Sequence, residues 1–275
     1  IEMKVKDLIY QINSKSSFLC IGLDTDISKI PKFLLDEQDP IFSFNKSIID
    51  ITNKYCVAYK LNTAFYESLG TQGWISMGKT IDYINDNFPE LFTIADAKRG
   101  DIGNTSKMYA QTFFAKMNFD SVTINPYMGS DSVKPFLEFE NKISILLGLT
   151  SNTGAKDIQL KKINNEHVFI EMIKSSMVWG NEDNMMYVVG ATKPQYIEKI
   201  RELIPNHFLL MPGVGTQGGD LNEICKYALN DNIGILVNSS RSIIYASNDK
   251  KFANSASIEA LKLQKQMKTI MFEEK

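Results

Sequence analysis

Short apolar runs rich in β-branched and aromatic residues recur along the chain, and longer segments with helical spacing of apolar residues separate them. This alternation is typical of βαβ units and therefore of a parallel sheet. The predicted strands are residues 18–23, 57–61, 92–97, 121–124, 143–149, 186–189, 208–211 and 233–237. The predicted helices are residues 42–53, 74–87, 105–116, 133–138, 168–178, 194–203, 221–229 and 255–271.

Eight such strands and eight helices, with no linker rich in Pro, Gly or Ser, favour a single (β/α)8 barrel domain over residues 1–275. An open doubly wound sheet is the alternative. The amphipathic segment 5–12 predicts an N-terminal helix that covers the bottom of the barrel. A barrel of this class carries catalytic side chains at the carboxyl ends of its strands, and phosphate sites follow strands seven and eight. The polar segment 151–165 is predicted to be an irregular loop, long enough to act as a lid.

Composition excludes several classes of protein. Of 275 residues, 44% are hydrophobic and 23% charged, as in soluble globular domains, and 30 basic against 32 acidic residues leave a net charge of -2. That balance gives no general reason to bind nucleic acid or an anionic membrane, and no apolar run approaches the roughly 18 residues of a membrane span. Cys20, Cys56 and Cys225 lie in or beside apolar stretches without a CxxC pair. We interpret them as reduced buried thiols and expect a cytoplasmic location.

Histidine usage argues against two further kinds of site. His167 and His207 are the only histidines, they lie far apart, and neither belongs to a metal-ligand motif. A zinc cluster and a Ser/His/Asp triad are therefore not expected, and no metal site is predicted. We expect both histidines at the surface or at helix ends.

Charged residues gather where two predicted strands end. Asp96 and Lys98 close the third strand and Asp101 follows them, while Lys60 lies at the end of the second strand. Because residues two apart on a strand face the same way, Asp96 and Lys98 should point toward one site, with Lys60 beside them. The alternative is a solvated cluster of ion pairs. The position at the top of the predicted barrel favours a site.

The segment after the seventh strand is rich in glycine. The glycines within residues 213–218 satisfy GxGxxG, but a dinucleotide site needs this motif in its first βαβ unit and an acid about 20 residues later. Asn238 occupies that region, so we favour a phosphate site in which backbone N–H groups act with Ser240 and Arg241 after strand eight. The alternative is that the glycines only form turns and that Arg241 caps a helix.

Two weaker polar signals follow the first and fifth strands. Asp24 could accept hydrogen bonds from sugar hydroxyls, although a turn or cap residue is the commoner role, and the residues around it lack the pattern of a calcium loop. Residues 150–152 carry short polar side chains that suit the edge of a heterocycle or the cap of the next helix.

Six motifs together resemble the orotidine 5'-phosphate decarboxylase family, in its longer bacterial branch. In chain order between Ile21 and Ile243 they are IGLDTD, AYKLNTAFYE, IADAKRGDIGNTS, LTSN, MPGVGTQGGD and VNSSRSI. The resemblance implies a homodimeric barrel that uses no cofactor. It also implies conversion of orotidine 5'-monophosphate to uridine 5'-monophosphate and carbon dioxide, the last step of de novo UMP biosynthesis.

The resemblance assigns roles to individual residues. Lys60, Asp96, Lys98 and Asp101 match the family's catalytic charges, with Lys98 as proton donor to a carbanion at C6. Asp101 and Thr105 match positions that reach into the site of the partner subunit. The expected substrate-binding residues are Asp24 and Asn62 at the ribose, Ser151 at the pyrimidine, Gln217, Ser240 and Arg241 around the phosphate, and also Thr105 and Pro212. Residues 151–165 and 216–220 are the lid candidates, and Ser240 departs from the glycine that precedes the arginine in other branches.

Three alternatives stay open at this stage. A sugar-phosphate decarboxylase of the same suprafamily shares DxKxxD but needs a metal and a different residue set on strand two, where this chain has Lys60 and Asn62. A Schiff-base aldolase needs a neutral lysine, whereas flanking carboxylates stabilise the ammonium. A silent nucleotide-binding protein could retain Arg241 and Gln217 and lose the charged array, which is complete here.

Overall fold

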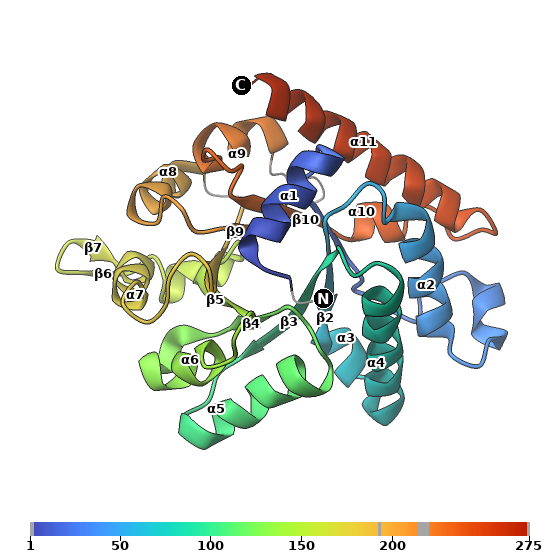
Figure 1. Cartoon of the computed structure of the whole chain (residues 1–275), viewed down its shortest axis with the longest axis horizontal. Coiled ribbons are helices and arrows are strands. Elements are labelled where there is room, and N and C mark those ends of the chain that lie inside the picture. The colour runs from blue at the N-terminus through green and yellow to red at the C-terminus, as the bar shows by residue number, and fades with distance from the viewer. Residues whose placement is uncertain (1–2, 192–193, 214–219, 274–275) are drawn as a thin grey trace.

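Eight parallel strands form a closed barrel with helices around its outside (Figure 1). The structure is a computed structural model that describes residues 3–191, 194–213 and 220–273. The barrel strands are β1 Leu19–Gly22, β2 Ala58–Asn62, β3 Phe92–Arg99, β4 Ser121–Ile124, β5 Ile143–Leu149, β8 Met185–Val189, β9 Leu209–Pro212 and β10 Ile235–Ser239. Around the barrel they follow the order β1, β10, β9, β8, β5, β4, β3, β2.

Closure of the sheet confirms the predicted barrel and excludes the open doubly wound sheet. Cys20 of β1 pairs with Ala58 of β2 on one side and with Asn238 of β10 on the other, so the first and last strands are neighbours. Strands β1, β4, β8 and β10 are buried along their whole length. Parallel strands covered on both faces are near-continuous apolar runs, and such runs made these strands recognisable in the sequence.

Helices and short turns connect the strands. They are α1 Val5–Lys15, η1 Lys32–Asp36, α2 Pro40–Thr52, α3 Thr63–Glu67, α4 Gly70–Asn87, α5 Gly103–Ala110, η2 Gln111–Lys116, η3 Pro126–Met128, α6 Ser130–Leu137, η4 Thr153–Asp157, α7 Val168–Ser176, α8 Pro194–Leu203, α9 Leu221–Ala228, α10 Arg241–Ile244 and α11 Phe252–Glu273. Side-chain caps explain several starts: Asp39 accepts a hydrogen bond from the Phe42 amide at α2, and Asp220 accepts one from the Asn222 amide at α9. Among the described residues, no helix has the length and apolar character that crossing a membrane requires.

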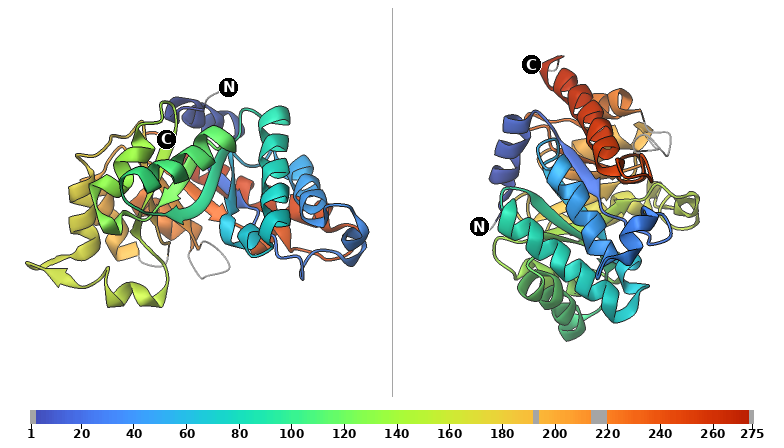
Figure 2. Two further views of the ribbon diagram at one scale, coloured as in Figure 1. Left: turned by 90° about the horizontal axis from the view of Figure 1, so that it is seen from below. Right: turned by 90° about the vertical axis from the view of Figure 1, so that its right-hand side faces the viewer.

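The N-terminal helix α1 closes the amino end of the barrel, as predicted. Val5, Leu8 and Ile12 form its buried face. At its end, the Lys15 ammonium donates to the carbonyls of Asn53, at 2.9 Å, and Cys56, at 3.2 Å, just before β2 begins. Figure 2 shows α1 at the end of the barrel opposite the loops that follow the strands. The carboxyl ends of the strands therefore remain open for a site.

Two predicted elements differ from the structure in an informative way. The helix predicted over 105–116 is α5 followed by the π-helical η2, in which Phe113 and Phe114 are both buried. The strand predicted from residue 233 begins at Ile235, because Ile233 and Gly234 have φ values of 68° and 63° that a strand does not allow.

The segment 151–165 is more regular than predicted. It contains η4 and the strand β6 Lys162–Ile163, which pairs antiparallel with β7 Glu166–His167. Figures 1 and 2 show this hairpin projecting from the body of the protein. Thr150 ties the base of the segment to Gln159, whose side-chain carbonyl accepts from the Thr150 amide at 2.8 Å. The prediction that the segment acts as a lid stays a prediction.

His207 is buried at 8% exposure and lies four residues beyond the end of α8, which corrects the expectation of a position at the surface or at a helix end. Its ring packs edge-on against Tyr187, with ring centroids 5.5 Å apart, and within the described part of the chain neither ring nitrogen has a hydrogen-bond partner. Burial lowers the pKa of His207, and the nearby Arg201 lowers it further against an opposing effect of Glu182.

This burial predicts that His207 weakens the fold in acid. In the unfolded chain the histidine has its ordinary pKa of about 6.5 and binds a proton more readily than in the folded chain. The free energy of unfolding therefore falls as the pH drops below that value. His207→Phe keeps the contact with Tyr187 and removes the titration. Urea unfolding at about pH 7.5 and about pH 5.5 should show a smaller loss of unfolding free energy in the variant. An equal loss in both proteins would contradict this account.

Candidate active site

A cavity of about 450 Å³ lies at the carboxyl ends of the barrel strands. It is lined by residues from the ends of most strands, namely Asp24, Lys60, Asn62, Asp96, Lys98, Leu147, Thr150, Ser151, Asn152, Val188, Leu210, Pro212, Gly213, Asn238, Ser239, Ser240 and Arg241. Nine of the residues predicted for the site are therefore in one cavity: Asp24, Lys60, Asn62, Asp96, Lys98, Ser151, Pro212, Ser240 and Arg241.

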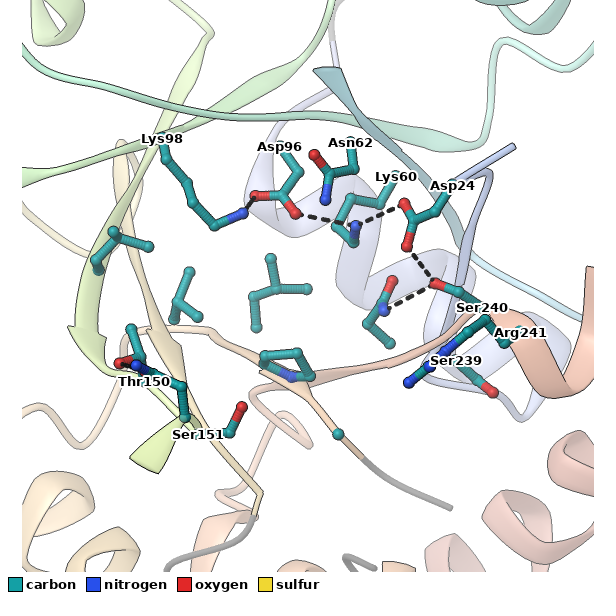
Figure 3. A pocket seen from close by; sticks show the side chains of 17 residues that line it. Asp24, Lys60, Asn62, Asp96, Lys98, Thr150, Ser151, Ser239, Ser240 and Arg241 are labelled. Carbon is teal, nitrogen blue, oxygen red and sulfur yellow. Dashed lines mark hydrogen bonds and ion pairs between the residues drawn. The ribbon is translucent and has the colours of Figure 1, made fainter. Parts of the chain in front are cut away.

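Alternating charges form one wall of this cavity (Figure 3). The Lys60 ammonium lies between two carboxylates, 3.2 Å from Asp24 Oδ1 and 3.0 Å from Asp96 Oδ2. The Lys98 ammonium contacts the other oxygen of Asp96, Oδ1, at 2.6 Å. Only 4% of the Lys60 side chain and 12% of the Asp96 side chain are exposed, against 49% for Lys98. Lys98 is therefore the member of the array that solvent or a ligand can reach most easily.

The burial and the charges together fix the ionisation of the array. Burial by itself lowers the pKa of Lys60, but the carboxylates of Asp24 and Asp96 outweigh it and hold this pKa above its ordinary value. Burial raises the pKa of Asp96, and the ammonium groups of Lys60 and Lys98 outweigh that effect and hold its pKa well below the ordinary value. Asp96 is thus an anion and Lys60 a cation at neutral pH.

The backbone at Lys98 departs from a regular strand. Its φ is 49°, in the left-handed region that costs a residue with a Cβ about 1 to 2 kcal/mol. The pairing of β3 with β4 shifts register at this point, between Ala95 and Arg99. Asp96 and Lys98 do meet, as predicted, but through this irregular backbone and not through simple strand alternation. Such strain is typical of functional sites.

Hydroxyl and amide groups adjoin the Asp24 end of the charged array (Figure 3). The Ser240 hydroxyl donates to Asp24 Oδ2 at 2.9 Å and accepts from the side-chain amide of Asn238 at 3.3 Å. A Cβ at Gly22 would lie 1.9 Å from Ser240 Oγ, so a glycine there is what allows this approach. Arg241 is exposed at the start of α10, and Figure 3 shows it across the cavity from Lys98. The charged array therefore has Lys98 at one end, and its other end adjoins the hydroxyl of Ser240 and the cation of Arg241.

Some lining residues were not predicted from the sequence. Leu147, Val188 and Leu210 provide an apolar part of the wall. Apolar side chains in a cavity of this kind suit the face of a heterocycle. Asn238 lines the cavity as well, and the polar residue at the end of an otherwise apolar strand was the signal that could have identified it.

Two predicted site residues that the structure describes, Asp101 and Thr105, are not in the cavity of this chain. Asp101 is half-buried and accepts a hydrogen bond from the neighbouring Ile102 amide at 2.8 Å, while Thr105 is exposed on α5. Neither residue lines the cavity. Gln217 and most of the lid candidate 216–220 lie outside the described residues.

Comparison with known proteins decides which family this site belongs to. The sequence model of the orotidine 5'-phosphate decarboxylase / HUMPS family matches residues 17–256. The chain belongs to this family.

Two curated orotidine 5'-phosphate decarboxylases are similar over nearly their whole length. The protein of Phocaeicola vulgatus is 58% identical over 270 residues, covering 98% of this chain and 99% of its own. That of Christiangramia forsetii is 57% identical over 265 residues, covering 96% and 97%. Among solved structures, the OMP decarboxylase of Leishmania donovani is 30% identical with a TM-score of 0.79, covering 95% of this chain and 99% of its own. The sequence and the barrel are thus similar to those of orotidine 5'-phosphate decarboxylases over nearly the whole chain.

Proposed function

We propose that the protein converts orotidine 5'-monophosphate to uridine 5'-monophosphate and carbon dioxide, the last step of UMP biosynthesis. The observation that carries the proposal is the array of Lys60, Asp96 and Lys98 in a cavity whose far side holds Ser240 and Arg241, in a chain of this family. This distribution suits a ligand that has a reacting ring at one end and a phosphate at the other.

The chemistry at the ring needs a cation and a proton source at one carbon. When the bond between C6 and the carboxylate breaks, its electron pair stays on C6 in an orbital that the ring delocalises poorly. The Lys98 ammonium stabilises that charge and then gives its proton to C6, and solvent returns a proton to the neutral amine. Asp96 and Lys60 hold the ammonium in position before the reaction, so no reorganisation is needed as charge develops.

The remaining contacts follow from the lining of the cavity. Asp24 and Asn62 suit hydroxyls of the ribose, and Ser151 suits the polar edge of the pyrimidine. Ser240 and Arg241 line the end that suits the phosphate, together with Gln217 by its sequence position, and Pro212 also lines the cavity. Binding energy at the phosphate can contribute to catalysis when it orders loops over the ring.

We further propose that two copies of the chain share their active sites. Asp101 and Thr105 lie outside the cavity of their own chain, beside exposed apolar side chains that a second copy could cover. Among these is Ile102, which lies between Asp101 and Thr105 in the chain and is 56% exposed. We also propose that residues 1–275 act as one domain in the cytoplasm, which suits the buried thiols of Cys20, Cys56 and Cys225.

The test of the function is the absorbance change of orotidine 5'-monophosphate with purified protein in excess chelator. Rapid conversion to uridine 5'-monophosphate under these conditions supports the proposal and rules out dependence on a metal that the chelator removes. No conversion by folded protein in chelator, with activity restored on a sugar phosphate when a divalent cation is added, would favour the metal-dependent decarboxylase. Binding of uridine 5'-monophosphate without turnover of any substrate would favour the silent binder.

Arg241→Ala should mainly weaken substrate binding. An arginine that binds phosphate makes charge-assisted hydrogen bonds, and their loss should raise KM about 10- to 100-fold with a smaller effect on kcat. Steady-state kinetics over a range of substrate concentrations separate the two constants. Arg241→Lys keeps the charge but loses the planar fork, and should fall between the two proteins. An unchanged KM in the alanine variant would exclude Arg241 from the phosphate site.

A further inference from the structure

The hydroxyl of Thr123, a buried residue of β4, connects the two central members of the charged array. It accepts a hydrogen bond from the Lys98 backbone amide at 2.9 Å and contacts Asp96 Oδ1, also at 2.9 Å. Because an amide can only donate, the hydroxyl accepts from Lys98 and its single proton is directed to Asp96. Thr123 does not line the cavity, so it acts on these two residues without touching a ligand there.

The register of the strands explains why a side chain is needed at this point. Ala95 pairs with Val122 and Arg99 with Ile124, so residues 96–98 of β3 face the single residue Thr123 of β4. The ladder of backbone hydrogen bonds is interrupted over this stretch. The Lys98 amide, turned by its φ of 49°, is bonded to the Thr123 hydroxyl instead. The hydroxyl thus holds an irregular backbone that carries the proton donor.

The same hydroxyl also limits the orientation of the Asp96 carboxylate. Oδ1 accepts from the Lys98 ammonium at 2.6 Å and from Thr123, while Oδ2 accepts from the Lys60 ammonium at 3.0 Å. With donors on both oxygens from β2, β3 and β4, the carboxylate has one favourable orientation. Without Thr123 the two flexible lysines alone would determine it.

We propose that Thr123 is a positioning residue for the decarboxylation, an inference that rests on the proposed function. Its hydroxyl fixes the Asp96 carboxylate and the Lys98 backbone, so that the Lys98 ammonium is in place before charge develops at C6. Of the groups that suit ribose and phosphate, Asp24 is joined to the array through Lys60, whereas the two partners of the Thr123 hydroxyl are Asp96 and Lys98. Loss of the hydroxyl should therefore reduce kcat and leave substrate binding nearly intact.

The experiment compares Thr123→Val, which keeps the shape and removes the hydroxyl, with Thr123→Ser, which keeps the hydroxyl. We expect kcat of the valine variant to fall about 10- to 100-fold, as for loss of a hydrogen bond to a charged group. We expect KM, and the Kd for uridine 5'-monophosphate, to change less than about 3-fold, and the serine variant to retain kcat within about 3-fold.

Ser121→Ala is the matched control. Ser121 lies two residues earlier on β4, is equally buried, and donates its hydroxyl to the Thr93 carbonyl at 3.0 Å. This variant loses a buried strand hydrogen bond next to no member of the charged array. It should lower the stability and leave kcat unchanged.

Three results would overturn the inference. They are a kcat of Thr123→Val equal to that of the wild type, a serine variant as slow as the valine variant, and an equal loss of kcat in Ser121→Ala. If Thr123→Val does not fold, Thr123→Cys takes its place, because its thiol is a weak donor and acceptor where serine is a strong one. Turnover by the wild type is measured first. Its absence would contradict the proposed function, whereas normal turnover with a fast valine variant would contradict only the role of Thr123.

Discussion

Turnover of orotidine 5'-monophosphate should fall by on the order of 10⁴-fold or more when Lys98 is replaced by alanine. The ammonium contacts Asp96 at 2.6 Å and is the most exposed charge of the array, so it is the group placed to meet the reacting carbon. Alanine removes both the cation that stabilises the carbanion and the proton that quenches it. No other described ammonium can substitute, because Lys60 is buried between two carboxylates.

Binding should survive this substitution. The groups that suit the phosphate lie at the other end of the cavity, so the Kd for uridine 5'-monophosphate should stay within about 10-fold of the wild type. Lys46→Ala is the matched control, because Lys46 forms an ion pair of 2.7 Å with Asp50 and its side chain is 44% exposed, close to the 49% of Lys98. Fixed-time assays that are stopped by quenching, or single-turnover assays, measure the residual rate. A Lys98→Ala enzyme as fast as the control would rule out Lys98 as the proton donor.

The barrel could be predicted from the sequence because each buried strand is a short apolar run that can be recognised locally. Strands such as β8, buried along all five residues, have no polar alternation and are recognised as short apolar runs between helices. The predicted end of a strand was wrong where the backbone has an unusual φ. Ile233 is apolar and β-branched, and only its φ of 68° reveals that the strand starts two residues later.

The charged residues of the candidate site could be predicted from the sequence. Lys60, Asp96 and Lys98 stand out as ionisable residues at the ends of apolar strands. Leu147 and Val188 could not be distinguished from their neighbours, because both faces of a barrel strand are apolar and the sequence does not say which face borders the cavity.

Thr123 was missed for a different reason. A threonine in a strand is ordinary, since β-branched residues favour strands whatever their role. Its importance depends on the register shift between β3 and β4 and on the left-handed φ of Lys98, and neither is visible in the sequence. Irregular pairing between neighbouring strands is a tertiary property, and residues that compensate for it are found only in the folded structure.

Mixing two inactive variants should restore activity if the sites are shared. Lys98→Ala leaves Asp101 intact, and Asp101→Ala leaves Lys98 intact. In a hybrid dimer one site receives both substitutions, while the other combines an intact Lys98 from one chain with an intact Asp101 from the other. Random exchange makes about half of the dimers hybrid with one complete site each, so about one quarter of the wild-type activity should return.

The position of Asp101 and Thr105 outside the cavity of their own chain is what makes this outcome specific. If Asp101 acted within its own chain, each chain of the hybrid would contain one defective site and no activity would return. The chains are unfolded together and refolded, and differently tagged copies allow the hybrid to be isolated by two affinity steps. Lys98→Ala mixed with Lys98→Met is the control, because no combination of these chains completes a site. Isolated hybrids as inactive as this control would show that Asp101 does not act across the interface.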